Sequence, residues 1–207
     1  MNEDNKVELV YNSQNNQELG ENYNLWAKDY ERELEEKYGY LAPLPAIELL
    51  VKYVPKPAKI LDAGAGTGLI GELLNQRGYN NIEGIDLSLG MLEEARSKNV
   101  YNGLYQMVLG ESLDFATDSF DAIISVGTFT YNHAPSNSFD ELIRITKPSG
   151  YIIFILRLDF YEQSDFKAKM SALEEFGKWK LVEISEASKC FAKTEPDVYV
   201  KAWVYQV

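Results

Sequence analysis

The chain has 207 residues, of which 45% are apolar and 25% charged, and its formal net charge is −12. A domain of this size buries enough surface to fold without a disulfide or a structural metal. One cysteine, Cys190, and one histidine, His133, exclude an internal disulfide, an iron–sulfur cluster and a multi-histidine metal site. The net charge disfavours nucleic acid as the main partner, because a duplex is a dense line of phosphates.

The location of the protein is predicted from its apolar runs and its polar start. The longest purely apolar run, residues 151–156, is far shorter than the roughly 20 residues that cross a bilayer. The start at Met1 is acidic and polar, unlike a signal peptide. We therefore expect a cytoplasmic protein without a membrane partner, present as a monomer or a weak homodimer.

The first forty residues are predicted to hold a flexible arm and a helix. Residues 1–20 are rich in Asn, Gln and Glu and poor in apolar side chains, which predicts a flexible acidic arm. Over residues 22–38, Trp26, Tyr30 and Leu34 recur at four-residue spacing. This spacing places them on one face of a helix.

The rest of the chain predicts an α/β fold. A helix is expected over residues 43–53, and from residue 58 predicted strands alternate with predicted helices. The strands cover 59–62, 82–86, 105–109, 120–126 and 151–156, and the helices cover 69–77, 88–98, 138–146 and 161–176. Alternation of this kind is typical of a Rossmann-like, doubly wound parallel sheet with right-handed crossovers.

The end of the chain departs from this alternation. Strands are predicted over residues 179–185 and 198–207, with no helix between them, which indicates a C-terminal antiparallel hairpin. We expect residues 21–207 to form one domain, with a helical lid over 21–53 and the Rossmann-like core over 58–207.

A glycine-rich turn follows the first strand of this core. Glycines between a strand and a helix allow a tight turn and the close approach of a ligand to the backbone. Gly66, Gly68 and Gly71 fit the dinucleotide pattern G-x-G-x-x-G, and Asp86 lies at the distance where that pattern has an acidic residue. The sequence is therefore compatible with an NAD-binding oxidoreductase.

A second interpretation takes the glycine frame from Gly64, two residues after Asp62. We expect the Asp62 carboxylate to point into the ligand crevice, where it would repel a pyrophosphate and hold an ammonium group. S-adenosylmethionine carries an ammonium and no phosphate, so this interpretation favours it over NAD.

Several ordered motifs lie at residues 61–68, at 82–88 followed by 91–95, and at 110–113 followed by 118–124. Together they resemble the motifs of the class I S-adenosylmethionine-dependent methyltransferase superfamily. The Tyr-x-x-Trp-Ala-x-x-Tyr segment over residues 23–30 is similar to the Williams–Beuren syndrome region methyltransferase-like group. The resemblance covers about residues 22–207 and implies a seven-stranded sheet with one antiparallel strand.

The resemblance also implies a set of cofactor-binding residues. The amino-acid end of S-adenosylmethionine would lie against Asp62, Gly64, Ala65, Gly66, Thr67 and Gly68, and Asp86 would accept hydrogen bonds from the ribose hydroxyls. The adenine would lie against Leu87, Met91, Glu111, Ser112 and Leu113, with Glu111 standing where many relatives have Asp. Val126 would border the cofactor, and Tyr23, Trp26 and Tyr30 would form a lid over its methionine portion.

The substrate side is predicted at Tyr131, His133 and Arg157. In the superfamily, the loop that holds His133 faces the transferable methyl group. His133 is either a general base that takes a proton from the acceptor or a residue that only shapes the pocket. Arg157 is either a cation that binds an acidic substrate group or the partner of Asp159. No residue set suggests a metal.

These observations predict a methyltransferase that moves a methyl group from S-adenosylmethionine to a small molecule and releases S-adenosylhomocysteine. Three alternatives stay open at this point: an NAD-binding oxidoreductase, a non-catalytic S-adenosylmethionine-binding module, and a protein methyltransferase.

Overall fold

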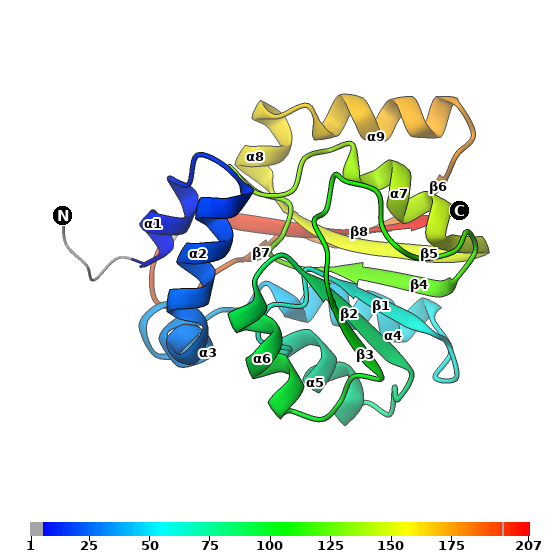
Figure 1. The fold of residues 1–207 in the computed structure, drawn as a ribbon. Helices are drawn as coiled ribbons and strands as arrows, with labels where there is room; N and C mark the ends of the chain where they lie inside the picture. Colours follow the sequence, from blue (N-terminus) through cyan, green and yellow to red (C-terminus); the bar gives the residue numbers. More distant parts are fainter. Residues whose placement is uncertain (1–5, 196) are drawn as a thin grey trace.

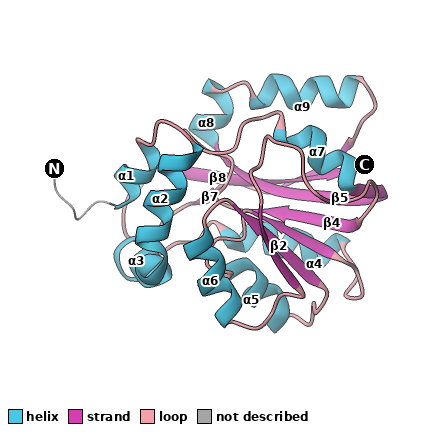
Figure 2. Cartoon of the chain, viewed as in Figure 1, coloured by secondary structure: helices cyan, strands magenta, loops and turns pink. Residues whose placement is uncertain are grey.

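A computed structural model describes residues 6–195 and 197–207. One twisted sheet with the strand order β3-β2-β1-β4-β5-β8-β6 lies between two layers of helices (Figure 1, Figure 2). The strands are β1 (Ile60–Ala63), β2 (Ile82–Asp86), β3 (Gly103–Gln106), β4 (Phe120–Ser125), β5 (Thr146–Arg157), β6 (Lys180–Ile184), β7 (Ser188–Lys189) and β8 (Tyr199–Gln206).

The strand directions confirm the predicted fold class. The pairs β1·β2, β1·β4, β2·β3 and β4·β5 are parallel, whereas β8 is antiparallel to both β5 and β6. The short strand β7 also pairs with β8. The sheet is therefore mostly parallel and ends in an antiparallel C-terminal part.

The helices cover both faces of the sheet and the edge at which its parallel strands end. They are α1 (Lys6–Tyr11), α2 (Asn16–Trp26), α3 (Tyr30–Glu33), α4 (Pro43–Tyr53), α5 (Leu69–Gln76), α6 (Leu89–Ser97), α7 (Ser138–Ile145), α8 (Leu158–Gln163) and α9 (Phe166–Glu175). A 3₁₀ turn, η1 (Ala27–Asp29), and a π turn, η2 (Leu34–Tyr38), make residues 16–38 almost continuously helical. In the part of the chain that the structure describes, no helix is long and apolar enough to cross a membrane.

Alternating side chains divide the core into two clusters, one on each face of the sheet. In β5, Ile153 and Ile155 pack with α4 and α5, while Ile152 and Phe154 pack with α7 and α9 on the other face. All four side chains are buried. A strand covered on both faces has no solvent side, which explains the uninterrupted apolar run in the sequence.

The predicted flexible arm is corrected for its described part, because residues 6–11 and 16–20 are helical. Val10 and Leu19 are buried with Trp26 and Leu34 in a third, smaller cluster. The apolar residues of this segment are too far apart in sequence to show a helical period, but the fold brings them together. Residues 1–5 of the predicted arm lie outside the described residues. We call residues 6–38 the N-terminal cap.

The predicted lid boundary is also corrected. Helix α4 has the predicted bounds, but its side chains Ala46, Ile47 and Leu50 are fully buried in the cluster that lies on β1 and β5. It therefore belongs to the core, and the N-terminal cap ends before it, at Tyr38. Gly39 has φ +63, a left-handed conformation that ends η2.

Several other elements differ from their predicted ranges, and β5 starts at Thr146 instead of residue 151. The predicted strand 105–109 is observed as β3 at 103–106, because it pairs with β2 in the register from Glu83↔Gly103 to Asp86↔Gln106. The predicted helix 161–176 is split into α8 and α9 at Ser164, which has an extended backbone.

Candidate active site

The carboxyl ends of β1, β2, β4 and β5 lie at one edge of the sheet, as parallel pairing requires. Gly64, Asp86, Val126 and Arg157 stand at these four ends. In doubly wound folds, ligands bind at this edge. The N-terminal cap stands at the same end of the sheet (Figure 1), and two adjoining cavities lie between it and the core.

The first cavity is lined by the glycine turn, the end of β2 and helix α2. Predicted residues in its wall are Tyr23, Tyr30, Gly64, Gly66, Asp86, Leu87, Met91, Val126 and His133. The structure thus brings together nine predicted residues from six separate parts of the chain.

The turn needs its glycines for two different reasons. Gly64 has φ +86, and a Cβ there would lie 2.1 Å from Oγ1 of Thr128. Gly66 has φ +53, and a Cβ there would meet nothing within 4 Å. Gly64 is therefore required for packing, whereas Gly66 leaves open space at the cavity wall.

Asp86 fastens this turn to the second strand. Its Oδ2 accepts the Gly66 N–H at 2.9 Å and its Oδ1 accepts the Ser88 N–H at 2.8 Å. Burial raises the pKa of Asp86, and these N–H groups counteract the increase. A carboxylate has about four acceptor positions, so Asp86 can still accept hydrogen bonds from a ligand in the cavity.

Asp62 does not lie where the sequence suggested. Its carboxylate is fully buried beneath the turn, and Oδ2 accepts the Tyr101 hydroxyl at 2.6 Å, while Oδ1 is buried without a hydrogen-bond partner among the described residues. Tyr101 Oη in turn accepts the Gly71 N–H. Asp62 lines neither cavity. Burial raises its pKa to about 7. The prediction that it points into the crevice is therefore corrected.

The remaining residues of the turn have structural contacts. Ala65 is buried and donates its N–H to the Ile85 carbonyl. Thr67 is buried and donates its hydroxyl to Glu31 of the N-terminal cap. A Cβ at Gly68 would lie 3.0 Å from the backbone of Ala95. None of these three predicted residues lines the cavities.

The predicted adenine edge is displaced along the chain. Met107, Val108 and Leu109 line the first cavity, whereas the predicted Glu111, Ser112 and Leu113 do not. Gly110 turns the chain with φ +98. Beyond it, Glu111 and Ser112 are exposed and Leu113 is buried in the core, so this prediction is corrected.

The N-terminal cap supplies an aromatic cluster above both cavities. Tyr23 stacks on Trp26 at 6.3 Å between ring centroids, and Tyr30 meets Trp26 edge-on at 4.7 Å. Tyr23 and Tyr30 line both cavities, but Trp26 lines the second one. Burial raises the pKa of both tyrosines well above their usual range, so both phenols stay protonated.

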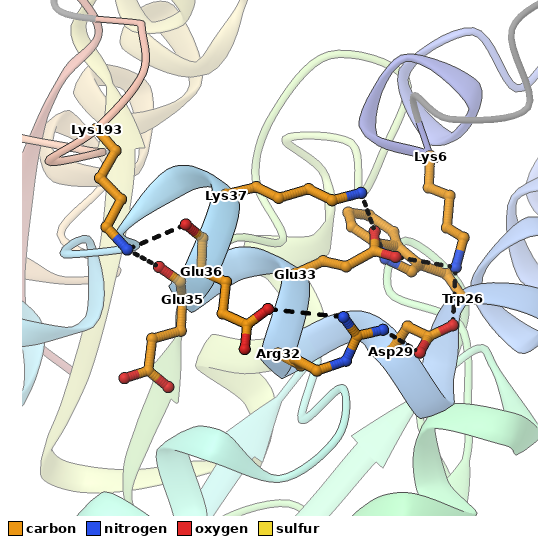
Figure 3. A network of polar contacts seen from close by, with 9 residues as sticks. All are labelled: Lys6, Trp26, Asp29, Arg32, Glu33, Glu35, Glu36, Lys37 and Lys193. Atoms are coloured by element: carbon orange, nitrogen blue, oxygen red, sulfur yellow. Dashed lines mark hydrogen bonds and ion pairs between the residues drawn. The ribbon is translucent and has the colours of Figure 1, made fainter.

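Polar contacts hold the cap in this position. Asn24 Oδ1 accepts the Gly90 N–H and the Ser88 hydroxyl, which joins α2 to the start of α6. Within the cap, Lys6 of α1 contacts both Asp29 and Glu33 (Figure 3). Glu33 is 7% exposed and also accepts the Trp26 indole N–H at 3.1 Å. Glu33 and Lys6 thus help to hold in place the aromatic cluster that lines the cavities.

His133 lies where the two cavities meet. Its Nδ1 is 2.7 Å from the Tyr131 carbonyl oxygen, which can only accept, so Nδ1 carries the proton. Its Nε2, 2.7 Å from the Tyr23 hydroxyl, is then the acceptor of that hydroxyl. Burial lowers the pKa of His133. The ring is therefore neutral near pH 7, with a basic nitrogen at the cavity wall.

The second cavity lies beyond His133. It shares Tyr23, Tyr30, Gly127 and His133 with the first cavity and extends to Arg157. Arg157 donates to Asp159 from Nε at 3.1 Å and from Nη2 at 2.7 Å, so the predicted pairing is present although the guanidinium also lines the cavity.

Tyr131, predicted on the substrate side, lines neither cavity. Its hydroxyl donates to Gln163 and its carbonyl orients His133. It contributes to the site through this orientation, and its predicted direct role is corrected.

Sequence reasoning missed most of the second cavity. Tyr11 lies in the segment read as an arm, and Tyr40 and Phe191 come together through an isolated β-bridge. Gly127 and Thr128, which line the first cavity, could have been predicted, because they directly follow Val126 at the end of β4. Over residues 6–195 and 197–207, no group of three or more His, Cys, Asp or Glu side chains could hold a metal ion.

Comparison with known proteins identifies the family. A methyltransferase domain family matches residues 61–154. Human methyltransferase-like protein 27 is 34% identical over 166 residues, which are 76% of this chain and 66% of that protein. The chain belongs to the class I S-adenosylmethionine-dependent methyltransferase superfamily. It spans just under two thirds of the length of the human relative.

Solved methyltransferase-like structures share the fold. A TehB-like S-adenosylmethionine-dependent methyltransferase from Corynebacterium glutamicum superposes with a TM-score of 0.66 at 21% identity, over 88% of this chain and 97% of that chain. The [4+2]-cyclase SpnF superposes with a TM-score of 0.74 at 14% identity, over 93% of this chain and 96% of that chain. Proteins with this fold can therefore have different activities, so the function has to be argued from the site.

Proposed function

We propose that this protein transfers a methyl group from S-adenosylmethionine, bound in the first cavity, to a small molecule. The observation that carries the proposal is the charge of this cavity. Among the described lining residues, Asp86 is the one charged group and no Lys or Arg is present. A cavity with one carboxylate suits a cationic cofactor, whereas the pyrophosphate of NAD would have no cation to meet it.

The side chains of the cavity fit the parts of this cofactor. Asp86 would accept the ribose hydroxyls, and Leu87 and Met91 would cover the adenine. The rings of Tyr23 and Tyr30 suit the sulfonium, because a cation is attracted to the face of an aromatic ring. The open side of Gly66 admits a ligand close to the backbone.

Methyl transfer needs an acceptor held in line with the methyl group and a group that takes the acceptor's proton. The cofactor supplies the methyl on a sulfonium: the acceptor atom bonds to the methyl carbon while the carbon–sulfur bond breaks and its electron pair stays on sulfur. His133 Nε2 would take this proton through the Tyr23 hydroxyl: Tyr23 passes its own proton to Nε2, which is unprotonated, and takes the proton of the acceptor in exchange. The N-terminal cap would exclude water. A cytoplasmic location remains part of this proposal.

Calorimetric titration with S-adenosylhomocysteine, with NAD as a control, tests the cofactor. We expect micromolar binding of S-adenosylhomocysteine and no binding of NAD. Asp86→Asn should weaken binding at least tenfold, because it removes the charged acceptor but keeps the side-chain size. Asp62→Asn is the matched control and should change affinity less than twofold, since Asp62 lies beneath the turn.

Binding of NAD alone would overturn the proposal. Equal losses in the two variants would overturn the assignment of Asp86 as the residue that contacts the ligand. Wild-type binding of S-adenosylhomocysteine combined with methyl transfer to a protein acceptor would replace the small-molecule part of the proposal.

A further inference from the structure

The second cavity has a wall that is almost entirely apolar and aromatic. Its lining includes Tyr11, Trp26, Tyr40, Phe129, Ile155 and Phe191. Flat aromatic walls favour a flat apolar ligand, because ring contacts add to the free energy gained from burying apolar surface. The few polar groups in this wall then determine which charge and which polar groups a bound ligand can carry.

Arg157 is the only residue with a formal charge in the described lining of this cavity. Its side chain is 18% exposed and lies over the rings of Tyr11 and Tyr131 at 6.0 and 5.6 Å. Its partner Asp159 is 43% exposed and is not part of the lining. Asp159 therefore neutralises Arg157 from the solvent side, while the guanidinium keeps N–H groups beyond the two that it donates to Asp159.

A second polar group in the wall has no partner. The Thr130 hydroxyl oxygen is buried and makes no hydrogen bond within the described residues, and Thr130 as a whole is 7% exposed. Buried hydroxyls are nearly always hydrogen-bonded, so an unpartnered one that lines a cavity indicates a ligand atom. Thr130 lies three residues before His133, and its carbonyl oxygen accepts the backbone N–H of His133.

We propose that the second cavity binds the methyl acceptor, and that this acceptor is a small aromatic molecule with one anionic group, of the class of aromatic carboxylates. The anionic group contacts Arg157, a polar group of the acceptor meets the Thr130 hydroxyl, and the ring lies between the aromatic walls. This inference rests on the proposed function, because it assumes that the first cavity holds the cofactor.

The position of the cavity supports this assignment. His133 and Tyr23 line both cavities, so a molecule in the second one can reach the cofactor past these two side chains. His133 is neutral, so Arg157 is the group in this lining that attracts an anion. A cationic acceptor would meet the Arg157 charge and find no carboxylate among the described lining residues.

The test uses three matched probes: 4-hydroxybenzoate (anionic), 4-hydroxybenzamide (neutral) and 4-hydroxybenzylamine (cationic). Their dissociation constants are measured by saturation-transfer-difference NMR on the 207-residue chain saturated with S-adenosylhomocysteine. We expect the benzoate to bind at least tenfold more tightly than the amide, and the amine to bind most weakly.

Variants locate the binding. Arg157→Gln should reduce the affinity for the benzoate to that for the amide, and it should leave the affinity for the amide unchanged. Thr130→Val should weaken the binding of both the benzoate and the amide several-fold. The control Arg77→Gln, which lies in neither cavity, should change nothing. S-adenosylhomocysteine affinity, measured on every variant, reports whether the variant is folded.

The other outcomes contradict either the proposed function or this inference alone. If S-adenosylhomocysteine does not bind wild-type protein, the proposed function fails and this inference fails with it. If it binds but none of the probes does, or the amine binds as tightly as the benzoate, this inference alone fails. A benzoate affinity that survives Arg157→Gln overturns it as well.

Discussion

His133 is held between a carbonyl oxygen and a phenol, and this pair of contacts fixes its chemistry. The Tyr131 carbonyl keeps the proton on Nδ1, and the Tyr23 hydroxyl donates to Nε2. A hydrogen bond donated to the unprotonated nitrogen stabilises the neutral ring and opposes protonation. Burial acts in the same direction. The cap residue Tyr23 thus helps to set the basicity of the candidate base.

An NMR titration can measure this directly, because the chain has one histidine. We expect the His133 pKa to lie below the usual 6.5, and Tyr23→Phe to raise it, since the variant loses the donor to Nε2. Tyr30→Phe is the control, because Tyr30 lies in the same cluster but makes no hydrogen bond to His133 in the described structure. A wild-type pKa above 6.5, or no difference between the two variants, would contradict this account.

Asp62 shows how a residue of a recognised motif can serve the fold. Its pKa is raised to about 7 by burial, so between pH 4 and 7 the folded protein holds a proton that the unfolded chain has lost. The free energy of unfolding contributed by Asp62 is therefore highest below its unfolded pKa and falls as the pH rises through about 7. An uncharged Asp62→Asn side chain does not have this dependence.

Urea denaturation at pH 5 and pH 8 tests this sign. The stability of Asp62→Asn relative to wild type should increase between these pH values, by on the order of 2 kcal/mol, which is the scale of one to two pKa units. Part of the dependence falls below pH 5 and is not sampled. A relative stability that is constant, or that decreases with pH, would mean that Asp62 is charged in the folded protein at pH 5.

At the scale of elements, the sequence predicted those whose boundaries are marked by local chemistry. Helix α4 begins at Pro43 and ends before Pro55, and Ser88 caps α6 by accepting the Met91 N–H. The cap helix α1 and the start of α2 were missed, because their burial depends on contacts with Trp26 and Leu34 further along the chain. Local patterns could not reveal that packing.

The same distinction applies to the candidate site. Strand ends placed Gly64, Asp86 and Val126 at one edge of the sheet, and they do line one cavity. The direction of a side chain at a strand end is set by distant residues: Tyr101, 39 positions away, binds Asp62 and keeps it beneath the turn. The second cavity lies between the cap, β8 and the segment before β8. No sequence motif predicts that these parts of the chain meet.

At the scale of the whole molecule, the N-terminal cap and the core are packed as two units with the cavities between them. The cap has its own apolar cluster, while the two large clusters belong to the core. The cap cluster is the smallest of the three, and polar contacts such as Asn24 to the start of α6 and Thr67 to Glu31 help to join the cap to the core. Segments with few apolar contacts open at a lower free energy than the core.

A ligand in the first cavity should therefore stabilise the cap more than the core, because it contacts both sides of this boundary. Hydrogen–deuterium exchange with and without S-adenosylhomocysteine measures the effect. We expect exchange to slow at least fivefold over residues 16–30, which supply Tyr23 and Tyr30, and to change little in β5 beyond the cavity. Equal protection of the cap in both samples would show that the cap is as stable without the ligand as with it, which would contradict this account.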